Sequence, residues 1–266
     1  MQGKTLKICT WLVNLMNNER EILVLVEDEK LDFELVKHLI KVYGLQDKYE
    51  IVSYKTNIYV LYQSMLNDGA FDDEFVNFDI FTHLSNREKD PVIKHTIFPE
   101  NKRYSDILLM FDFEPQDPRF TPEKIQKMVN HFTESTETGK LYINYPMVEA
   151  FYHMKSIPDS EYNSRDATLT ELPRKGYKNR VRKESLNGRD FEDFAISRDE
   201  CSIVINQNIE KAWQLTGEKG YSPILPETIH ILDKQLQKLK AEHTISVLCT
   251  SAFYIVDYNP KLIQKP

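Results

Sequence analysis

Cysteine is scarce in this chain of 266 residues, which contains only Cys9, Cys201 and Cys249. The three cysteines lie far apart, with no paired spacing and no accompanying histidine cluster. This pattern argues against a disulfide framework and against a zinc site. Such sparse cysteine usage is typical of a reducing compartment, so we expect a cytoplasmic protein.

Long hydrophobic runs are also lacking. The apolar stretch near the N-terminus, "ICTWLVNLM" at 8–16, is interrupted by Asn14 and followed by Glu19 and Arg20. It is too short and too polar to cross a membrane, and it has no small-residue cleavage site. We therefore expect no membrane association.

Two catalytic motifs are missing as well. The sequence contains neither G-x-S-x-G nor G-x-x-x-x-G-K-[ST], so it predicts no serine-hydrolase elbow and no Walker ATPase. The net charge of −7 gives the whole molecule no general attraction for nucleic acid. Any such binding would need a local basic patch.

Apolar runs alternate with helical patterns in the first part of the chain. Val- and Leu-rich runs typical of buried strands lie at 21–27, 49–55, 105–115 and 139–144. Helices are expected at 31–43, before Gly44, and at 57–67, 71–84, 122–134 and 145–154. This alternation predicts an α/β fold with a parallel-sheet core over 20–155. The remaining part, 156–266, contains a basic segment and helical patterns, and we expect it to form a mainly helical C-terminal subdomain.

Acidic residues gather where the predicted strands end. The carboxyl ends of parallel strands share one edge of a sheet, where ligands of open α/β folds bind. Carboxylates converging there would suit Mg²⁺ or Mn²⁺ and metal-assisted phosphodiester cleavage. The alternative is that each cluster is a helix cap or a solvated face. The clusters are Glu27, Asp28, Glu29 and Asp32; Asp112, Glu114 and Asp117; and Glu149.

Spacing favours the second cluster in particular. Asp112 and Glu114 alternate around Phe113, so in an extended chain both carboxylates point to the same side.

The start "ILVLVEDE" at 22–29 is also similar to receiver domains of response regulators. We reject that interpretation, because Asp112 stands too far along the chain for the phospho-accepting residue of so compact a domain.

Three motifs together resemble the Toprim family, in particular OLD-like and related bacterial anti-phage defence nucleases. They are "VEDEKLD" at 26–32, "FDFEPQD" at 111–117 and "NYPMVEAF" at 144–151, in the family's order, within 20–155. The resemblance implies that Glu27 is the general acid/base or metal-binding glutamate. It further implies that Asp112 and Glu114 form the metal-binding pair and that Glu149 is the later acidic ligand.

Two positions depart from the family pattern. Asp28 stands where the family has glycine, and Glu114 replaces the second aspartate. These departures favour an alternative in which the fold is kept as a non-catalytic binding or assembly subunit of a defence complex.

A basic run follows the predicted core. Six cations fall within ten residues of "RKGYKNRVRK", at 174–183, with no acid among them. On an acidic protein this patch could hold a phosphate backbone, although a solvated helix or a surface for an acidic partner protein are alternatives. The predicted nucleic-acid contacts are Lys175, Lys178, Arg180, Arg182 and Lys183.

The leading hypothesis is a Mg²⁺- or Mn²⁺-dependent endonuclease, a hydrolase acting on DNA or RNA. Its catalytic residues would be Glu27, Asp112 and Glu114, with Glu149 as a further metal ligand. The family resemblance implies a role in anti-phage defence beside a separate ATPase protein. The sequence leaves open whether the protein forms a homo-oligomer.

Overall fold

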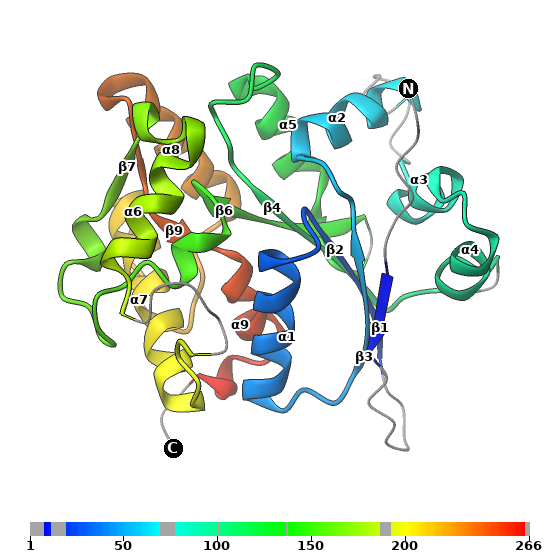
Figure 1. Ribbon diagram of the computed structural model, residues 1–266, viewed down its shortest axis with the longest axis horizontal. Coiled ribbons are helices and arrows are strands. Elements are labelled where there is room, and N and C mark those ends of the chain that lie inside the picture. Colours follow the sequence, from blue (N-terminus) through cyan, green and yellow to red (C-terminus); the bar gives the residue numbers. More distant parts are fainter. Residues whose placement is uncertain are drawn as a thin grey trace. The chain divides into compact units, whose positions relative to one another are not determined.

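The protein is described here by a computed structural model (Figure 1). The described residues are 8–11, 20–69, 78–100, 102–136, 138–186 and 193–263, with 8–11 described as backbone alone. Within them, no helix has both the length and the apolar character needed to cross a membrane.

A central sheet has the strand order β1-β3-β2-β4-β6-β5, and β9 pairs with β6. Strand β2 runs parallel to both β3 and β4, whereas β1 is antiparallel to β3, and β5 and β9 are antiparallel to β6. The expected α/β class with a mostly parallel sheet is thereby confirmed. The strands are β1 (Ile8–Trp11), β2 (Glu21–Val26), β3 (Lys48–Ser53), β4 (Asp106–Asp112), β5 (Thr133–Glu134), β6 (Gly139–Tyr145) and β9 (Leu248–Cys249).

The chain forms two compact units and passes repeatedly from one to the other. The predicted boundary at 155 and 156 stays a prediction. The first unit comprises Met1–Phe33, Leu45–Phe111 and Glu123–Leu141, and the second comprises Glu34–Gly44, Asp112–Pro122 and Tyr142–Pro266.

The core of the first unit is built on β2 and its neighbours. Residues 22–26 are completely buried, as the uninterrupted apolar run predicts for a strand covered on both faces. Every residue of β4 is buried too. Polar side chains can therefore reach a ligand only at the ends of these strands or beyond them.

Short polar residues start the helices of the first unit. Asn57, Asp79 and Asp90 each accept a hydrogen bond from a backbone N–H of the first helical turn. Such caps satisfy N–H groups that have no partner within the helix. The expected helix in 71–84 lies partly outside the described residues. The helices are α2 (Ile58–Asn67), α3 (Ile80–Arg87) and α4 (Pro91–Ile97); α5 (Pro122–His131) follows β4, and α1 (Leu31–Tyr43) follows β2.

Beyond β6, the described residues of the second unit form α-helices and a two-stranded sheet. Helix α7 begins with a capping box formed by Ser197 and Glu200, and it ends at Gly217, whose φ of 71° is left-handed. The elements are α6 (Gly176–Glu184), α7 (Arg198–Thr216), α8 (Thr228–Glu242) and α9 (Tyr254–Tyr258), with β7 (Asp166–Thr168) antiparallel to β8 (Thr244–Ser246).

The segment after β6 differs from the helix that its sequence predicts. Only the short 3₁₀ helix Val148–Phe151 forms, after a cis bond between Tyr145 and Pro146. The reason is that the carbonyl of Pro146 accepts hydrogen bonds from the backbone of Phe113 and Glu114. These bonds to a distant segment take the place of bonds along a helix.

Gly139 at the start of β6 provides a test of the first unit. Its φ is 111°, and an added Cβ would lie 2.7 Å from Cδ1 of Leu109. Because side-chain-bearing residues rarely adopt this conformation, we expect Gly139→Ala to lower the free energy of unfolding by about 2 kcal/mol in urea titrations. Gly217→Ala is the control, since Gly217 faces open space; its loss should be about 1 kcal/mol. Equal losses would contradict this account.

Candidate functional site

A hollow of about 430 Å³ lies in the first unit, just beyond the carboxyl ends of β2 and β3. This is the position at which ligands of open α/β sheets bind. The first acidic cluster contributes most of its lining. The lining residues are Glu27, Asp28, Glu29, Lys30, Ser53, Lys55 and Thr56.

Backbone bonds hold Glu27 at this hollow. Its carbonyl accepts a hydrogen bond of 3.0 Å from the N–H of Lys55, and the hydroxyl of Ser53 donates to the same oxygen at 3.4 Å. Lys55 has a left-handed φ of 60°, which costs free energy for a residue with a side chain. The pairing of β2 with β3 thus continues past the strands and fixes the half-buried Glu27 beside the hollow.

The other acids of this cluster have local structural roles. Asp28 accepts a hydrogen bond of 2.7 Å from the N–H of Lys30, and the buried Asp32 accepts one of 3.3 Å from the N–H of Asp28. Glu29 forms an ion pair of 3.1 Å with Lys55. Asp28 and Asp32 thus bond to backbone N–H groups of the turn before α1, and Glu29 pairs with Lys55. Glu27 stays the predicted residue for chemistry.

The second and third acidic clusters come together in the second unit. The N–H of Phe113 donates to the carbonyl of Asn144 at 3.0 Å, and the N–H of Val148 donates to Oδ1 of Asp112 at 2.8 Å. Asp112 is only 6% exposed. The motifs at 111–117 and 144–151, which are distant in the sequence, thus form one hydrogen-bonded structure.

The backbone is strained at Glu114, which is half-buried. Its φ is 37°, a left-handed value that is uncommon outside glycine and costs about 1–3 kcal/mol. Such strain is frequent at functional sites. Nearby, Asp117 binds the guanidinium of Arg119 through both carboxylate oxygens, at 2.8 and 2.6 Å. Asp117 therefore stabilises the turn.

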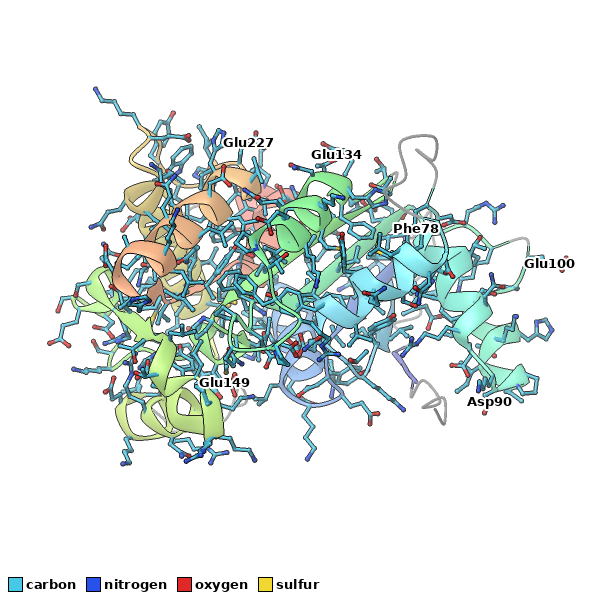
Figure 2. All side chains as sticks on the ribbon, turned by 90° about the horizontal axis from the view of Figure 1, so that it is seen from above. Phe78, Asp90, Glu100, Glu134, Glu149 and Glu227 are labelled. Atoms are coloured by element: carbon cyan, nitrogen blue, oxygen red, sulfur yellow. The ribbon has the colours of Figure 1, made fainter. Side chains whose placement is uncertain are left out.

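Glu149, labelled in Figure 2, is 2% exposed. Its Oε1 lies 3.0 Å from Nζ of Lys178, and its Oε2 has no hydrogen-bond partner among the residues that the structure describes. Oδ1 of Asn144 accepts hydrogen bonds from the N–H of Ser251 and the thiol of Cys249, which ties the preceding turn to the C-terminal part of the unit. A solvent-exposed role for Glu149 in the dipole of a first helical turn is therefore excluded.

The predicted ligands suit a divalent cation in their chemistry. All four are carboxylates, and the unpartnered Oε2 of Glu149 is a buried oxygen that a cation would satisfy. Within the described ranges, however, no group of three or more His, Cys, Asp or Glu side chains lies close enough to hold a metal ion. The convergence of Glu27, Asp112, Glu114 and Glu149 on one metal site stays a prediction.

The basic run is divided between paired and exposed cations. Lys178 pairs with Glu149, and Arg180 binds Glu171 at 3.0 Å and the carbonyl of Asp166 at 2.6 Å. These two cations hold α6 in the second unit. Four other members of the run are solvent-exposed, and they are the better candidates for phosphate contacts: Arg174, Lys175, Arg182 and Lys183.

Sequence reasoning missed a pocket of about 570 Å³ in the second unit, which is lined in part by Lys211. A signal was present in α7, because Lys211 occupies the helix face that Val204 and Asn208 bury. A lysine on a buried face needs partners or a ligand.

Comparison with protein-family models, curated proteins and solved structures found no match to this chain.

The ion pair between the buried Glu149 and the partly exposed Lys178 gives a stability prediction. Lys178→Met leaves a buried carboxylate without its cation, so we expect a loss of about 2 kcal/mol in the free energy of unfolding. Glu149→Gln combined with Lys178→Met should lose less than the sum of the two single changes. Arg182→Met, on the exposed side of the same helix, is the control and should change stability by less than about 0.5 kcal/mol. Additive losses in urea titrations would show that the pair is not coupled.

Proposed function

We propose that the protein is a metal-dependent endonuclease that hydrolyses phosphodiester bonds of DNA or RNA with Mg²⁺ or Mn²⁺. One observation carries the proposal. Glu27 directly follows β2 and Asp112 ends β4, and these two strands pair in parallel with Val26 opposite Met110. This parallel pairing supports the proposal that the two carboxylates share the edge of the sheet at which ligands of open α/β folds bind.

Each carboxylate has a role that its surroundings support. A bound Mg²⁺ or Mn²⁺ supplies Lewis-acid polarisation of the phosphodiester and a more acidic water. Asp112 and Glu114 would hold the cation, and the N–H of Val148 orients the carboxylate of Asp112. Glu27, half-buried beside a hollow, would accept the proton of the attacking water as general base or serve as a further ligand. Glu149 would complete the ligand set.

The exposed cations of the basic run supply the phosphate contacts. The net charge of −7 makes a local patch necessary, and Lys175, Arg182 and Lys183 are exposed together with Arg174. The resemblance to Toprim nucleases extends the proposal to anti-phage defence beside a separate ATPase protein. Cysteine usage supports a cytoplasmic setting.

Replacing each proposed catalytic carboxylate by the amide of the same shape tests its role. We expect Glu27→Gln and Asp112→Asn each to lower Mg²⁺- or Mn²⁺-dependent cleavage of a labelled plasmid or RNA by roughly 10²–10⁴-fold. The asparagine still offers Val148 an acceptor oxygen, so the fold should persist. Glu29→Gln, which removes an acid paired with Lys55, is the matched control and should retain cleavage. Full activity in Glu27→Gln and Asp112→Asn would exclude the proposed chemistry.

The basic run is tested by the salt dependence of binding. We expect replacement of Arg174, Lys175, Arg182 and Lys183 by Gln to weaken nucleic-acid binding and to reduce the slope of log K against log salt by about one unit per lost contact. Lys89 and Lys94, exposed in the first unit, provide a control pair whose replacement by Gln should leave the slope unchanged. Equal effects of the two sets would indicate non-specific attraction.

The second candidate function is a non-catalytic binding or assembly subunit of a defence complex. Two of the proposed ligands already bind other groups of the chain, which favours this candidate. Asp112 accepts a hydrogen bond from the N–H of Val148, and Glu149 forms an ion pair with Lys178. Wild-type protein that binds nucleic acid but cleaves neither DNA nor RNA with Mg²⁺ or Mn²⁺ would select this candidate.

A further inference from the structure

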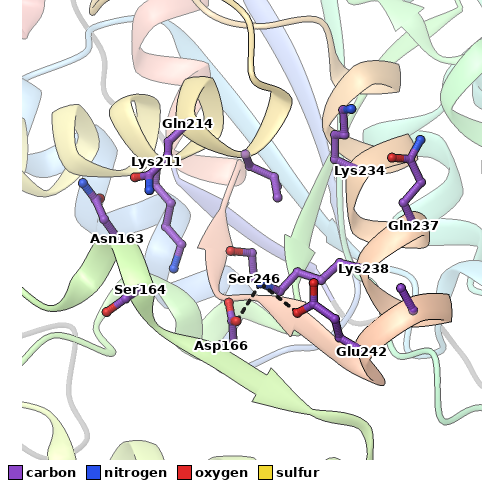
Figure 3. A pocket seen from close by; sticks show the side chains of 12 residues that line it. Asn163, Ser164, Asp166, Lys211, Gln214, Lys234, Gln237, Lys238, Glu242 and Ser246 are labelled. Carbon is purple, nitrogen blue, oxygen red and sulfur yellow. Dashed lines mark ion pairs between the residues drawn. The ribbon is translucent and has the colours of Figure 1, made fainter.

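A polar pocket of about 570 Å³ lies within the second unit, among α7, α8 and the β7–β8 strand pair (Figure 3). It uses none of the proposed catalytic residues and none of the cations in the basic run. We propose that this pocket is a binding site for a small molecule that carries a phosphate group on a polar body, such as a sugar phosphate.

Lysines dominate the charge of the pocket lining. Lys211, Lys234 and Lys238 face only two carboxylates, Asp166 and Glu242, among the residues that line it. Both carboxylates bind the same lysine, because Nζ of Lys238 lies 2.7 Å from Asp166 and 3.5 Å from Glu242 (Figure 3). Because Lys238 engages both acids, neither Lys211 nor Lys234 forms an ion pair with a carboxylate of the described lining.

Lys234 is available to a ligand. It is half-buried in the lining, one helical turn before Lys238 on α8. Among the described residues, it makes no ion pair and no hydrogen bond. A lysine that has no partner of its own and lies beside a second cation is a favourable binding point for an anion.

Lys211 adds a buried cation to the pocket. It is 1% exposed, and its ammonium donates to the carbonyls of Tyr162 at 2.7 Å and Arg165 at 2.6 Å. Carbonyls accept these bonds but carry no net charge to offset the lysine. Burial lowers the pKa of Lys211 to about 7, with Arg165 and Lys238 also disfavouring its charge and Asp166 favouring it. An anion in the pocket would favour the charged form.

The size and the neutral groups of the pocket indicate the class of ligand. Its volume falls in the range of small-molecule sites and exceeds the needs of inorganic phosphate alone. Gln214 and Gln237 contribute amides, and Ser246 contributes a hydroxyl. These groups can hydrogen-bond the hydroxyls of a sugar, while the lysines bind the phosphate.

The test is isothermal titration calorimetry of the full chain with ribose 5-phosphate and with ribose. We expect ribose 5-phosphate to bind and ribose not to bind. Lys234→Gln should weaken binding about tenfold, the effect of losing one charge-assisted hydrogen bond. Asp166→Asn should instead strengthen binding, because it removes a negative charge and releases Lys238. Lys240→Gln, an exposed change on α8 outside the pocket, is the matched control and should leave binding unchanged.

Circular dichroism spectra that match the wild type will establish that each variant is folded. The proposal is overturned if ribose 5-phosphate does not bind, if Lys234→Gln binds it as tightly as the wild type, or if Lys240→Gln weakens binding equally. It is also overturned if only a 5′-phosphorylated oligonucleotide binds in a Lys234-dependent manner, since the pocket would then hold a nucleic-acid end. None of these outcomes depends on nuclease activity.

Discussion

The parallel pairing of β2 with both β3 and β4 leaves residues 22–26 with no exposed surface. A charged group within such a strand would be buried without water, at a cost of several kcal/mol. The buried Glu50 of β3 lies 3.6 Å from Lys48 and from Lys102, whereas the carboxylates proposed as metal ligands follow or end their strands. Glu27 and Asp112 occupy these positions, and the hollow beside Glu27 begins where the apolar run stops.

The carboxylates beyond the strand ends also help to build the fold. Asp112 accepts the N–H of Val148, and Glu149 is buried against Lys178, so the second and third acidic motifs stabilise the second unit. A fixed orientation of this kind is what a ligand-binding carboxylate needs before its ligand arrives. The left-handed backbone of Glu114 also indicates that the surrounding structure fixes this segment.

The sequence predicts the elements that depend on local chemistry. The apolar run of β2, the helix pattern before Gly44 and the start of α5 at Pro122 all depend on neighbouring residues, and the structure confirms them. The helix expected after β6 does not form, because Pro146 bonds to a segment far back in the chain.

Features that depend on distant contacts could not be predicted. The basic run gives no sign that Lys178 pairs with Glu149 or that Arg180 binds Glu171, because those partners are brought near only by folding. The lysine pocket is assembled from separate segments, and Lys211 alone gave a hint of it. Spacing can therefore indicate which carboxylates are candidates, but not which of them are engaged by cations of the chain itself.

The most direct measurement is anomalous X-ray diffraction from crystals of the protein soaked in Mn²⁺. The account predicts an anomalous peak beyond the ends of β2 and β4, within about 2.0–2.4 Å of carboxylate oxygens of Glu27 and Asp112. The same crystals soaked in Mg²⁺ should show no such peak. Saturating Mn²⁺ that leaves both carboxylates without a peak would contradict the account.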